Sequence, residues 1–302
     1  MKSLAFWAVA VTCFLIVFGG YVASSNSGMG CGPDWPLCNG VLVPVLKGAT
    51  LIEYAHRLIG ALLAVLTGVL CLHLWRFPRR GADRIASAAT VGLLTVQIML
   101  GAFVVWFDLP PAIVTIHFLM AFLFLGCLLW IWRNVPYSSF APLPTSAPTE
   151  AKRHARVLLV FFTTTLLLGA YVKHQHYGLA CGWLACGESI WPSSKAQMWQ
   201  TAHRAAATAT VLYTIWTAFI AHRRGWGRPL KRRLLLAAAV GLLQAALGVG
   251  TIESGLHLPW AVVHLAGGTW LALLLIDLCI CLHLPAIAAA KSTPSLSISG
   301  RS

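Results

Sequence analysis

Residues 51–75 read LIEYAHRLIGALLAVLTGVLCLHLW, an apolar run that carries Glu53, His56 and Arg57 close to its start. A transmembrane α-helix needs about 20 consecutive, mostly apolar residues, so this stretch predicts one. The chain holds further runs of this kind, and none alternates polar and apolar residues as a β-barrel strand does. We therefore expect an all-α integral membrane protein with eight transmembrane helices, at Leu4–Val22, Leu51–Trp75, Ile85–Trp106, Ala112–Trp132, Val157–Tyr171, Ala205–Ala221, Leu234–Ile252 and Trp260–Leu284.

Composition supports a membrane protein and argues against a nucleic-acid-binding one. Of 302 residues, 58% are hydrophobic and 10% are charged, and the mean hydropathy is +0.77. A soluble domain of this length does not bury so much apolar surface. The net charge is +14, but 17 of the 22 basic residues fall on one side of the predicted membrane spans. The positive-inside rule makes that side the cytoplasm and places both termini there, so we expect no nucleic-acid partner.

The histidine-bearing span has a copy later in the chain. The sequence EYAHR at 53–57 returns as QTAHR at 200–204, and His117 and His264 are separated by the same 147 residues. Within each copy the two histidines are 61 residues apart. The chain therefore contains two copies of a unit with two histidines, which differ in that Glu53 is replaced by glutamine in the second copy.

A second match at the same offset, QIMLG at 97–101 against QAALG at 244–248, supports a duplication of the whole chain. Four spans return the chain to its starting side, so the copies form two pseudosymmetric four-helix bundles related by an axis along the membrane normal. The expected divisions are an N-terminal bundle at 1–135, a cytoplasmic linker at 136–153, a C-terminal bundle at 154–290 and a polar tail at 291–302.

The four repeated histidines are candidate metal ligands. His56 and His117 are predicted at matching depth in the second and fourth spans, and His203 and His264 repeat that placement. Two imidazoles facing each other inside one bundle are typical of a bis-histidine b-type haem. Single intramembrane histidines can instead be core residues bonded to neighbours, but four in two copies of one spacing favour ligands. Zinc fits less well, because no third ligand recurs at either pair.

Glu53 precedes His56 by three residues and therefore lies about one helical turn away on nearly the same face. A carboxylate inside a membrane is costly unless it is paired or used, so Glu53 is a candidate catalytic residue. The alternative is a carboxylate favoured by the positive end of the helix dipole. Arg57 and Arg204 follow the first histidine of each copy and are candidate partners for haem propionates. The alternative for both arginines is a side chain that reaches the lipid headgroups.

Four cysteines lie in predicted outer loops as two close pairs, Cys31 with Cys38 and Cys181 with Cys186. The outer side of the membrane is oxidising, so we expect the disulfides Cys31–Cys38 and Cys181–Cys186, each clamping a loop over a histidine site. A thiol-exchange role for the first pair is the alternative, because a short exposed bridge can be labile.

The most specific motifs are GMGCGPDWPLC at 28–38 and EYAHR at 53–57. With the later histidines, the second cysteine pair and the duplicated plan, they make the chain resemble the haem A synthase family, which includes bacterial enzymes and a mitochondrial cytochrome oxidase assembly protein. The resemblance extends over the chain up to its tail. It implies an enzyme of the bacterial inner membrane that oxidises the C8 methyl group of haem O to the formyl group of haem A, for cytochrome oxidase.

The resemblance also implies roles for individual residues. His56 and His117 would hold the iron of the substrate haem, and Glu53 would be the glutamate needed for reaction. His203 and His264 would hold a haem b cofactor. The implied partners are haem O, membrane lipid, and the haem O synthase and assembly factors of cytochrome oxidase. The main rival is a bis-histidine dihaem b-type membrane electron carrier, and a haem-delivering transporter is a third class.

Overall fold

The computed structural model describes residues 1–78, 81–134, 148–187 and 189–283, in which the long regular elements are all α-helices. All eight are long and apolar enough to cross a membrane, which confirms the predicted all-α membrane fold. They are α1 (Lys2–Ser24), α2 (Gly48–Arg76), α3 (Gly81–Trp106), α4 (Pro111–Asn134), α5 (Thr149–His174), α6 (Lys195–Arg223), α7 (Arg228–Glu253) and α8 (Leu258–His283).

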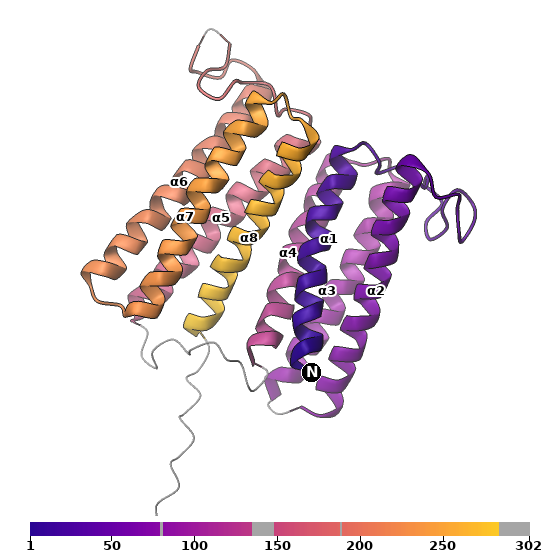
Figure 1. Ribbon diagram of the computed structural model, residues 1–302, viewed down its shortest axis with the longest axis horizontal. Coiled ribbons are helices and arrows are strands. Elements are labelled where there is room, and N and C mark those ends of the chain that lie inside the picture. Colours follow the sequence, from indigo (N-terminus) through magenta and orange to yellow (C-terminus); the bar gives the residue numbers. More distant parts are fainter. Residues whose placement is uncertain (79–80, 135–147, 188, 284–302) are drawn as a thin grey trace, which may run out of the picture.

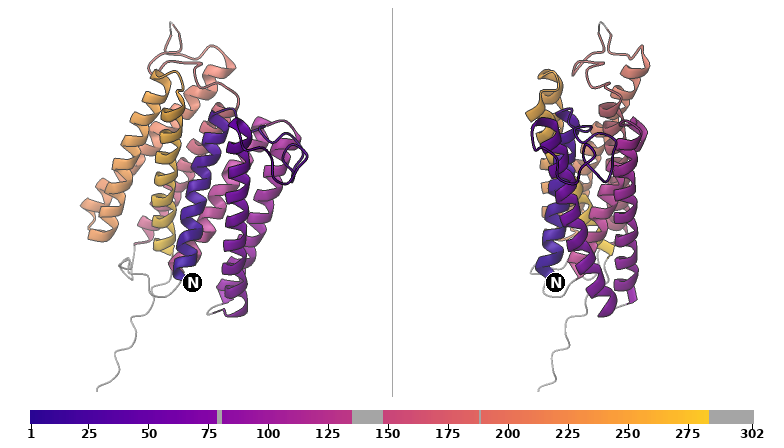
Figure 2. Two further views of the ribbon diagram at one scale, coloured as in Figure 1. Left: turned by 45° about the vertical axis from the view of Figure 1, so that its right-hand side comes forward. Right: turned by 90° about the vertical axis from the view of Figure 1, so that its right-hand side faces the viewer.

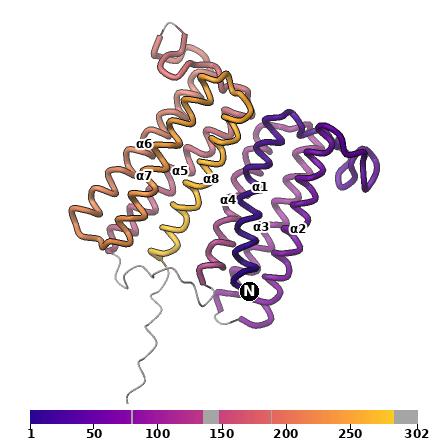
Figure 3. Tube along the Cα trace, viewed as in Figure 1, coloured from indigo at the N-terminus to yellow at the C-terminus, as the bar shows by residue number. Residues whose placement is uncertain are grey.

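The helices form two four-helix bundles that stand side by side, α1–α4 and α5–α8 (Figures 1 and 2). Within each bundle the helices pack in a ring, so that α1 contacts α2 and α4, and α5 contacts α6 and α8. The Cα trace follows the same up-and-down path twice (Figure 3). The two cysteine loops consequently lie at one end of the molecule, and the N-terminus and the end of α8 lie at the other (Figure 1).

The bundles meet along α1, α4, α5 and α8. Helix α4 packs against α8, and the contact of α1 with α8 is matched by that of α5 with α4, as a twofold repeat requires. Lipid provides little hydrophobic drive between helices, so close packing and polar contacts must hold this interface. Leu128 and Leu275 are fully buried in the core that spans it. Arg133 Nε lies 2.5 Å from Asp277 Oδ1, a partly buried ion pair joining α4 to α8.

Helix α6 begins ten residues before the apolar run that predicted it, at Lys195 rather than Ala205. Ser194 accepts a hydrogen bond from the backbone of Gln197, and the Gln197 side chain bonds back to the backbone of Ser194. This capping box starts the helix within a polar segment that hydropathy does not detect. The early start places His203 inside the helix, with two turns preceding it.

Helix α5 begins at Thr149, so the last residues of the expected linker at 136–153 are helical. Residues 136–147 of that linker and the whole expected tail at 291–302 lie outside the described residues.

Candidate functional site

The histidines of the first bundle lie on opposite helices of its ring, His56 on α2 and His117 on α4. The two imidazoles are close enough to interact electrostatically. Each of the other two helices presents one glycine, α1 to the ring of His56 and α3 to the ring of His117. A Cβ added at Gly19 of α1 would lie 3.2 Å from His56 Nε2, and one at Gly101 of α3 would lie 3.4 Å from His117 Cε1. All four helices therefore contribute one residue to the same region of the bundle.

The second bundle repeats this arrangement with His203 on α6 and His264 on α8, again close enough to interact electrostatically. A Cβ at Gly169 of α5 would lie 2.7 Å from His203 Cε1, and one at Gly248 of α7 would lie 3.1 Å from His264 Cε1. A Cβ contact under 3.0 Å forces a shift, so Gly169 is the tightest of the four positions. The glycines thus leave open the space that a side chain would take beside each imidazole.

Each histidine also has a polar neighbour, and the kind of neighbour differs within a pair. His203 Nδ1 lies 3.1 Å from the backbone oxygen of Thr165, and His56 interacts with the backbone of Leu15 on the corresponding helix. His117 and His264 face glutamine side chains instead. Gln97 Nε2 lies 3.3 Å from His117 Nε2, and Gln244 Nε2 lies 3.1 Å from His264 Nδ1.

These residues fit a haem held by two axial histidines. In the described part of the chain, His117 Nδ1, Gln97 Oε1 and Gln244 Oε1 are buried without a hydrogen-bond partner. Buried polar atoms without partners are uncommon in native proteins, and these three lie at the histidine pairs. Bis-histidine haem iron takes one imidazole from each side, and the flat macrocycle needs space along the helices. The paired rings and the four facing glycines supply both.

Glu53 is buried and points toward the first cysteine loop. Its Oε2 atom accepts a hydrogen bond from the backbone amide of Cys31 at 2.8 Å, and its Oε1 atom lies 2.6 Å from Arg57 Nη2. Arg57 also donates to the backbone oxygen of Leu37 at 2.8 Å. The carboxylate and the guanidinium therefore fasten the start of α2 to both ends of the loop between the two cysteines.

Gln200 occupies the same position in the second bundle. Its Oε1 atom accepts from the backbone amide of Cys181 at 2.5 Å, and its Nε2 atom donates to the oxygens of Gly178 at 2.7 Å and Cys181 at 3.1 Å. Arg204 donates to the backbone oxygens of Gly182 and Trp183. Glu53 and Gln200 thus make one shared contact with a loop, and only Glu53 adds a charge to it.

Both expected disulfides are present, Cys31–Cys38 and Cys181–Cys186. Each loop is also held from the far side of its bundle. A Cβ at Gly28 would lie 3.2 Å from Leu109, in the turn between α3 and α4, and one at Gly178 would lie 3.0 Å from Leu256, in the turn between α7 and α8. A glycine three residues before the first cysteine of each loop lets that turn pack against it.

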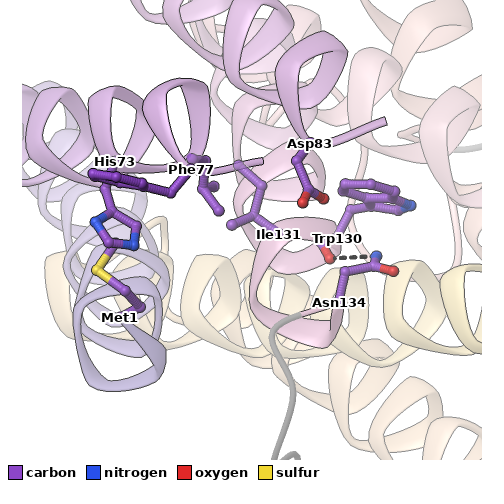
Figure 4. Close-up of a pocket in the computed structure, with 8 residues that line it drawn as sticks. Met1, His73, Phe77, Asp83, Trp130, Ile131 and Asn134 are labelled. Atoms are coloured by element: carbon purple, nitrogen blue, oxygen red, sulfur yellow. Dashed lines mark hydrogen bonds between the residues drawn. The ribbon is translucent and has the colours of Figure 1, made fainter. Parts of the chain in front are cut away.

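A separate cavity lies at the opposite end of the first bundle, lined by Met1, His73, Leu74, Phe77, Asp83, Trp130, Ile131 and Asn134 (Figure 4). Asn134 Nδ2 donates to the backbone oxygen of Trp130 at 2.9 Å. The cavity has a volume of about 20 Å³, which is enough for a single water molecule. The histidine pairs, rather than this cavity, are the candidate site.

The structure brings together every predicted pair and adds residues that the sequence did not single out as site residues. His56 faces Gly19 and His203 faces Gly169, and the glutamines of the repeated 97–101 and 244–248 segments contact the second histidines. That repeat was the signal available for the glutamines, but similarity between copies does not show what a residue touches. Gly19 and Gly169 are offset by 150 residues rather than 147, and the Tyr-Val pairs that follow them at 21–22 and 171–172 share this offset.

The fold and site define a multi-pass membrane protein built from two copies of a four-helix bundle, each with an internal histidine pair. The chain belongs to the cytochrome oxidase assembly protein family, whose model matches residues 2–50 and 45–276. The predicted resemblance is thereby confirmed.

Named relatives agree with this family. The chain is 29% identical over 263 residues to a haem A synthase of Exiguobacterium sp., covering 84% of this chain and 85% of the relative. It is also 29% identical over 281 residues to the haem A synthase of Bacillus licheniformis, covering 87% and 90%. A haem A synthase of Bacillus cereus strain G9842 is 28% identical over 280 residues. The similarity thus spans both bundles.

Proposed function

We propose that this chain is a haem A synthase, an oxidoreductase that converts the C8 methyl group of haem O into the formyl group of haem A. The observation that carries the proposal is the duplicated histidine site with one asymmetric position. Both copies offer two imidazoles and two glycines to a flat ligand. Only the first copy has a carboxylate on the helix of its first histidine, Glu53 on α2, where α6 has Gln200. Family membership and the named relatives support the same activity.

In this proposal His56 and His117 bind the substrate, haem O, within α1–α4, and the farnesyl tail of the substrate extends toward lipid. His203 and His264 hold a haem b cofactor within α5–α8. A bound haem b supplies one-electron transfer, which suits a reaction that withdraws electrons from a methyl group. The chain's part is to hold each macrocycle by two imidazoles and to keep water from the apolar bundle interior.

Glu53 is the proposed proton acceptor, because oxidation of a methyl group releases protons along with electrons. Its carboxylate is held in place at the start of α2 by a hydrogen bond from the amide of Cys31 and by Arg57. Gln200 makes the equivalent amide contact but cannot exchange a proton. The chemistry is therefore assigned to the first bundle and the electron-transfer group to the second.

Arg57 and Arg204 remain candidate propionate partners, but both already donate to loop carbonyls. Their guanidinium groups have further N–H donors to offer. The distribution of basic residues supports cytoplasmic termini, so both histidine sites lie toward the outer half of the membrane, beneath the cysteine loops. The proposed setting is the bacterial inner membrane.

Extraction and mass analysis of the haems bound to the purified protein tests the proposal. The host must make haem O. An enzyme of this kind should release haem B together with haem O or its oxidised products. A protein that releases haem B alone from such cells would fit the dihaem electron carrier, and one that releases haem O unmodified would fit a transporter.

A further inference from the structure

Gln97 and Gly101 are four residues apart on α3, and both contact the ring of His117. Residues with this spacing share one face of a helix. On α7, Gln244 and Gly248 face His264 in the same way. The repeated segments QIMLG and QAALG thus have a common structural use: each presents an amide and an open space to the second histidine of its pair.

The first histidine of each pair has a different polar neighbour. The backbone oxygen of Thr165 can only accept a hydrogen bond, so its contact with His203 fixes the proton on Nδ1 and leaves Nε2 for a metal. The side-chain amide of Gln244 can donate or accept, depending on which way it is turned. The tautomer of His264 is therefore set by an adjustable group, whereas that of His203 is set by the backbone.

The buried atoms without hydrogen-bond partners indicate how the side-chain amides of Gln97 and Gln244 are oriented when a metal is bound. In the described part of the chain, Oε1 of both Gln97 and Gln244 is buried without a partner, and so is His117 Nδ1. A histidine that binds a metal through one nitrogen carries a proton on the other, and that N–H needs an acceptor. Half a turn of either amide brings its oxygen toward the ring nitrogen that its own nitrogen now faces, His264 Nδ1 or His117 Nε2. The amide oxygen then accepts from that ring nitrogen, and the other ring nitrogen, which in His117 is the unpartnered Nδ1, is left for a metal.

We propose that Gln97 and Gln244 are positioning residues for the two haem sites. Each amide oxygen accepts the N–H of the neighbouring histidine, His117 or His264, and orients the ring so that its other nitrogen meets iron. The inference rests on the haem sites of the proposed function. An acceptor on a ligand histidine makes the ring a stronger electron donor, so these glutamines also tune the reduction potential of the iron.

The second bundle gives the cleaner test, because its haem is the resident cofactor in this account. Full-length Gln244→Leu and Gln244→Glu proteins are purified, and haem B per protein and its midpoint potential are measured by pyridine haemochrome and redox titration. Gln244→Leu removes the acceptor, so the potential should rise and haem affinity should fall by about 10–100-fold. Gln244→Glu strengthens the acceptor at nearly the same size, so the potential should fall.

Leu243→Ala serves as the matched control, because Leu243 is the preceding residue of α7 and is half exposed toward lipid. It should leave haem content and potential unchanged. Opposite shifts for the leucine and glutamate variants support a hydrogen bond to the ligand, whereas equal potentials or shifts of one sign overturn it. If the leucine variant does not fold, the sign of the shift in Gln244→Glu still decides. A wild-type protein without haem in α5–α8 would overturn the proposed function, and this inference with it.

Discussion

The carboxylate of Glu53 accepts a 2.8 Å hydrogen bond from the backbone amide of Cys31, at the foot of the first disulfide loop. Gln200 makes the equivalent bond to Cys181 at 2.5 Å. The residue that distinguishes the two copies therefore has a structural contact that both copies share. Both bundles have the hydrogen bond to the loop, and only the first bundle has a carboxylate charge at this position.

This relationship makes Glu53→Gln a clean substitution. The second bundle demonstrates that a glutamine at this position can hold the loop amide, so the variant should fold, keep its disulfide and bind haem. Haem A formation should nevertheless fall by about a hundredfold or more, the usual loss when a proton-transfer group is removed. Haem A is measured by mass spectrometry of extracted haems, with Gln200→Glu as the matched control. Full activity of Glu53→Gln would contradict the proton role.

The second prediction separates the two histidine pairs. His203→Ala should lose the haem b of α5–α8, because the variant lacks one of the two imidazoles that hold the iron. His56→Ala should retain that haem and lose bound haem O. Quantifying haem B and haem O in each purified variant checks the assignment. A His203→Ala protein with its full complement of haem B would contradict the cofactor site.

The third prediction concerns the glycines that face the rings. In Gly169→Ala the new Cβ lies 2.7 Å from His203 Cε1, so the ring must move. Overpacking of this kind costs about 1–3 kcal/mol, which corresponds to a loss of haem affinity of about 5-fold to 150-fold. Gly60→Ala is the control, because no atom lies within 4 Å of its added Cβ. Equal haem affinity in the two variants, measured by titration, would argue against a tight cradle.

The fourth prediction tests the contact between bundles. Asp277→Leu removes the carboxylate that pairs with the partly buried guanidinium of Arg133, and it should destabilise the protein by less than the roughly 3–5 kcal/mol of a fully buried pair. The double variant Arg133→Met with Asp277→Leu should recover most of this loss. Thermal unfolding in detergent compares them with Glu150→Gln, which removes the partner of the exposed Arg224 and should cost about 1 kcal/mol or less. A double variant no more stable than the single one would show that the pair does not act as a unit.

The features that could be predicted are those that depend on short sequence patterns and on their spacing. Apolar runs of membrane length predicted the eight helices, and the equal spacing of His56 with His117 and of His203 with His264 predicted which histidines share a bundle. The disulfides followed from cysteine proximity and an oxidising compartment. Asp277, unusual in the middle of an apolar span, pairs with Arg133 of the neighbouring helix α4.

What could not be predicted depends on contacts between distant segments. Glu53 reaches Cys31 only because the loop folds back over the start of α2, and a helical wheel cannot reveal that. Arg57 looked free to meet a propionate, yet it bonds to Glu53 and to the loop. Gln97 and Gly19 belong to helices without a ligand of their own, and their approach to the rings follows from how the four helices pack. Helix α6 started early because capping chemistry, not hydropathy, sets its first residue.

The central claim is that this chain turns haem O into haem A at its first histidine pair. The most direct measurement is the haem A content, by mass spectrometry, of cells that make haem O, lack a haem A synthase of their own and express this chain. The account predicts haem A in cells with the wild-type chain and with Gln200→Glu, and haem O in place of haem A with Glu53→Gln. Unconverted haem O in cells whose wild-type protein is folded and carries haem B would contradict it.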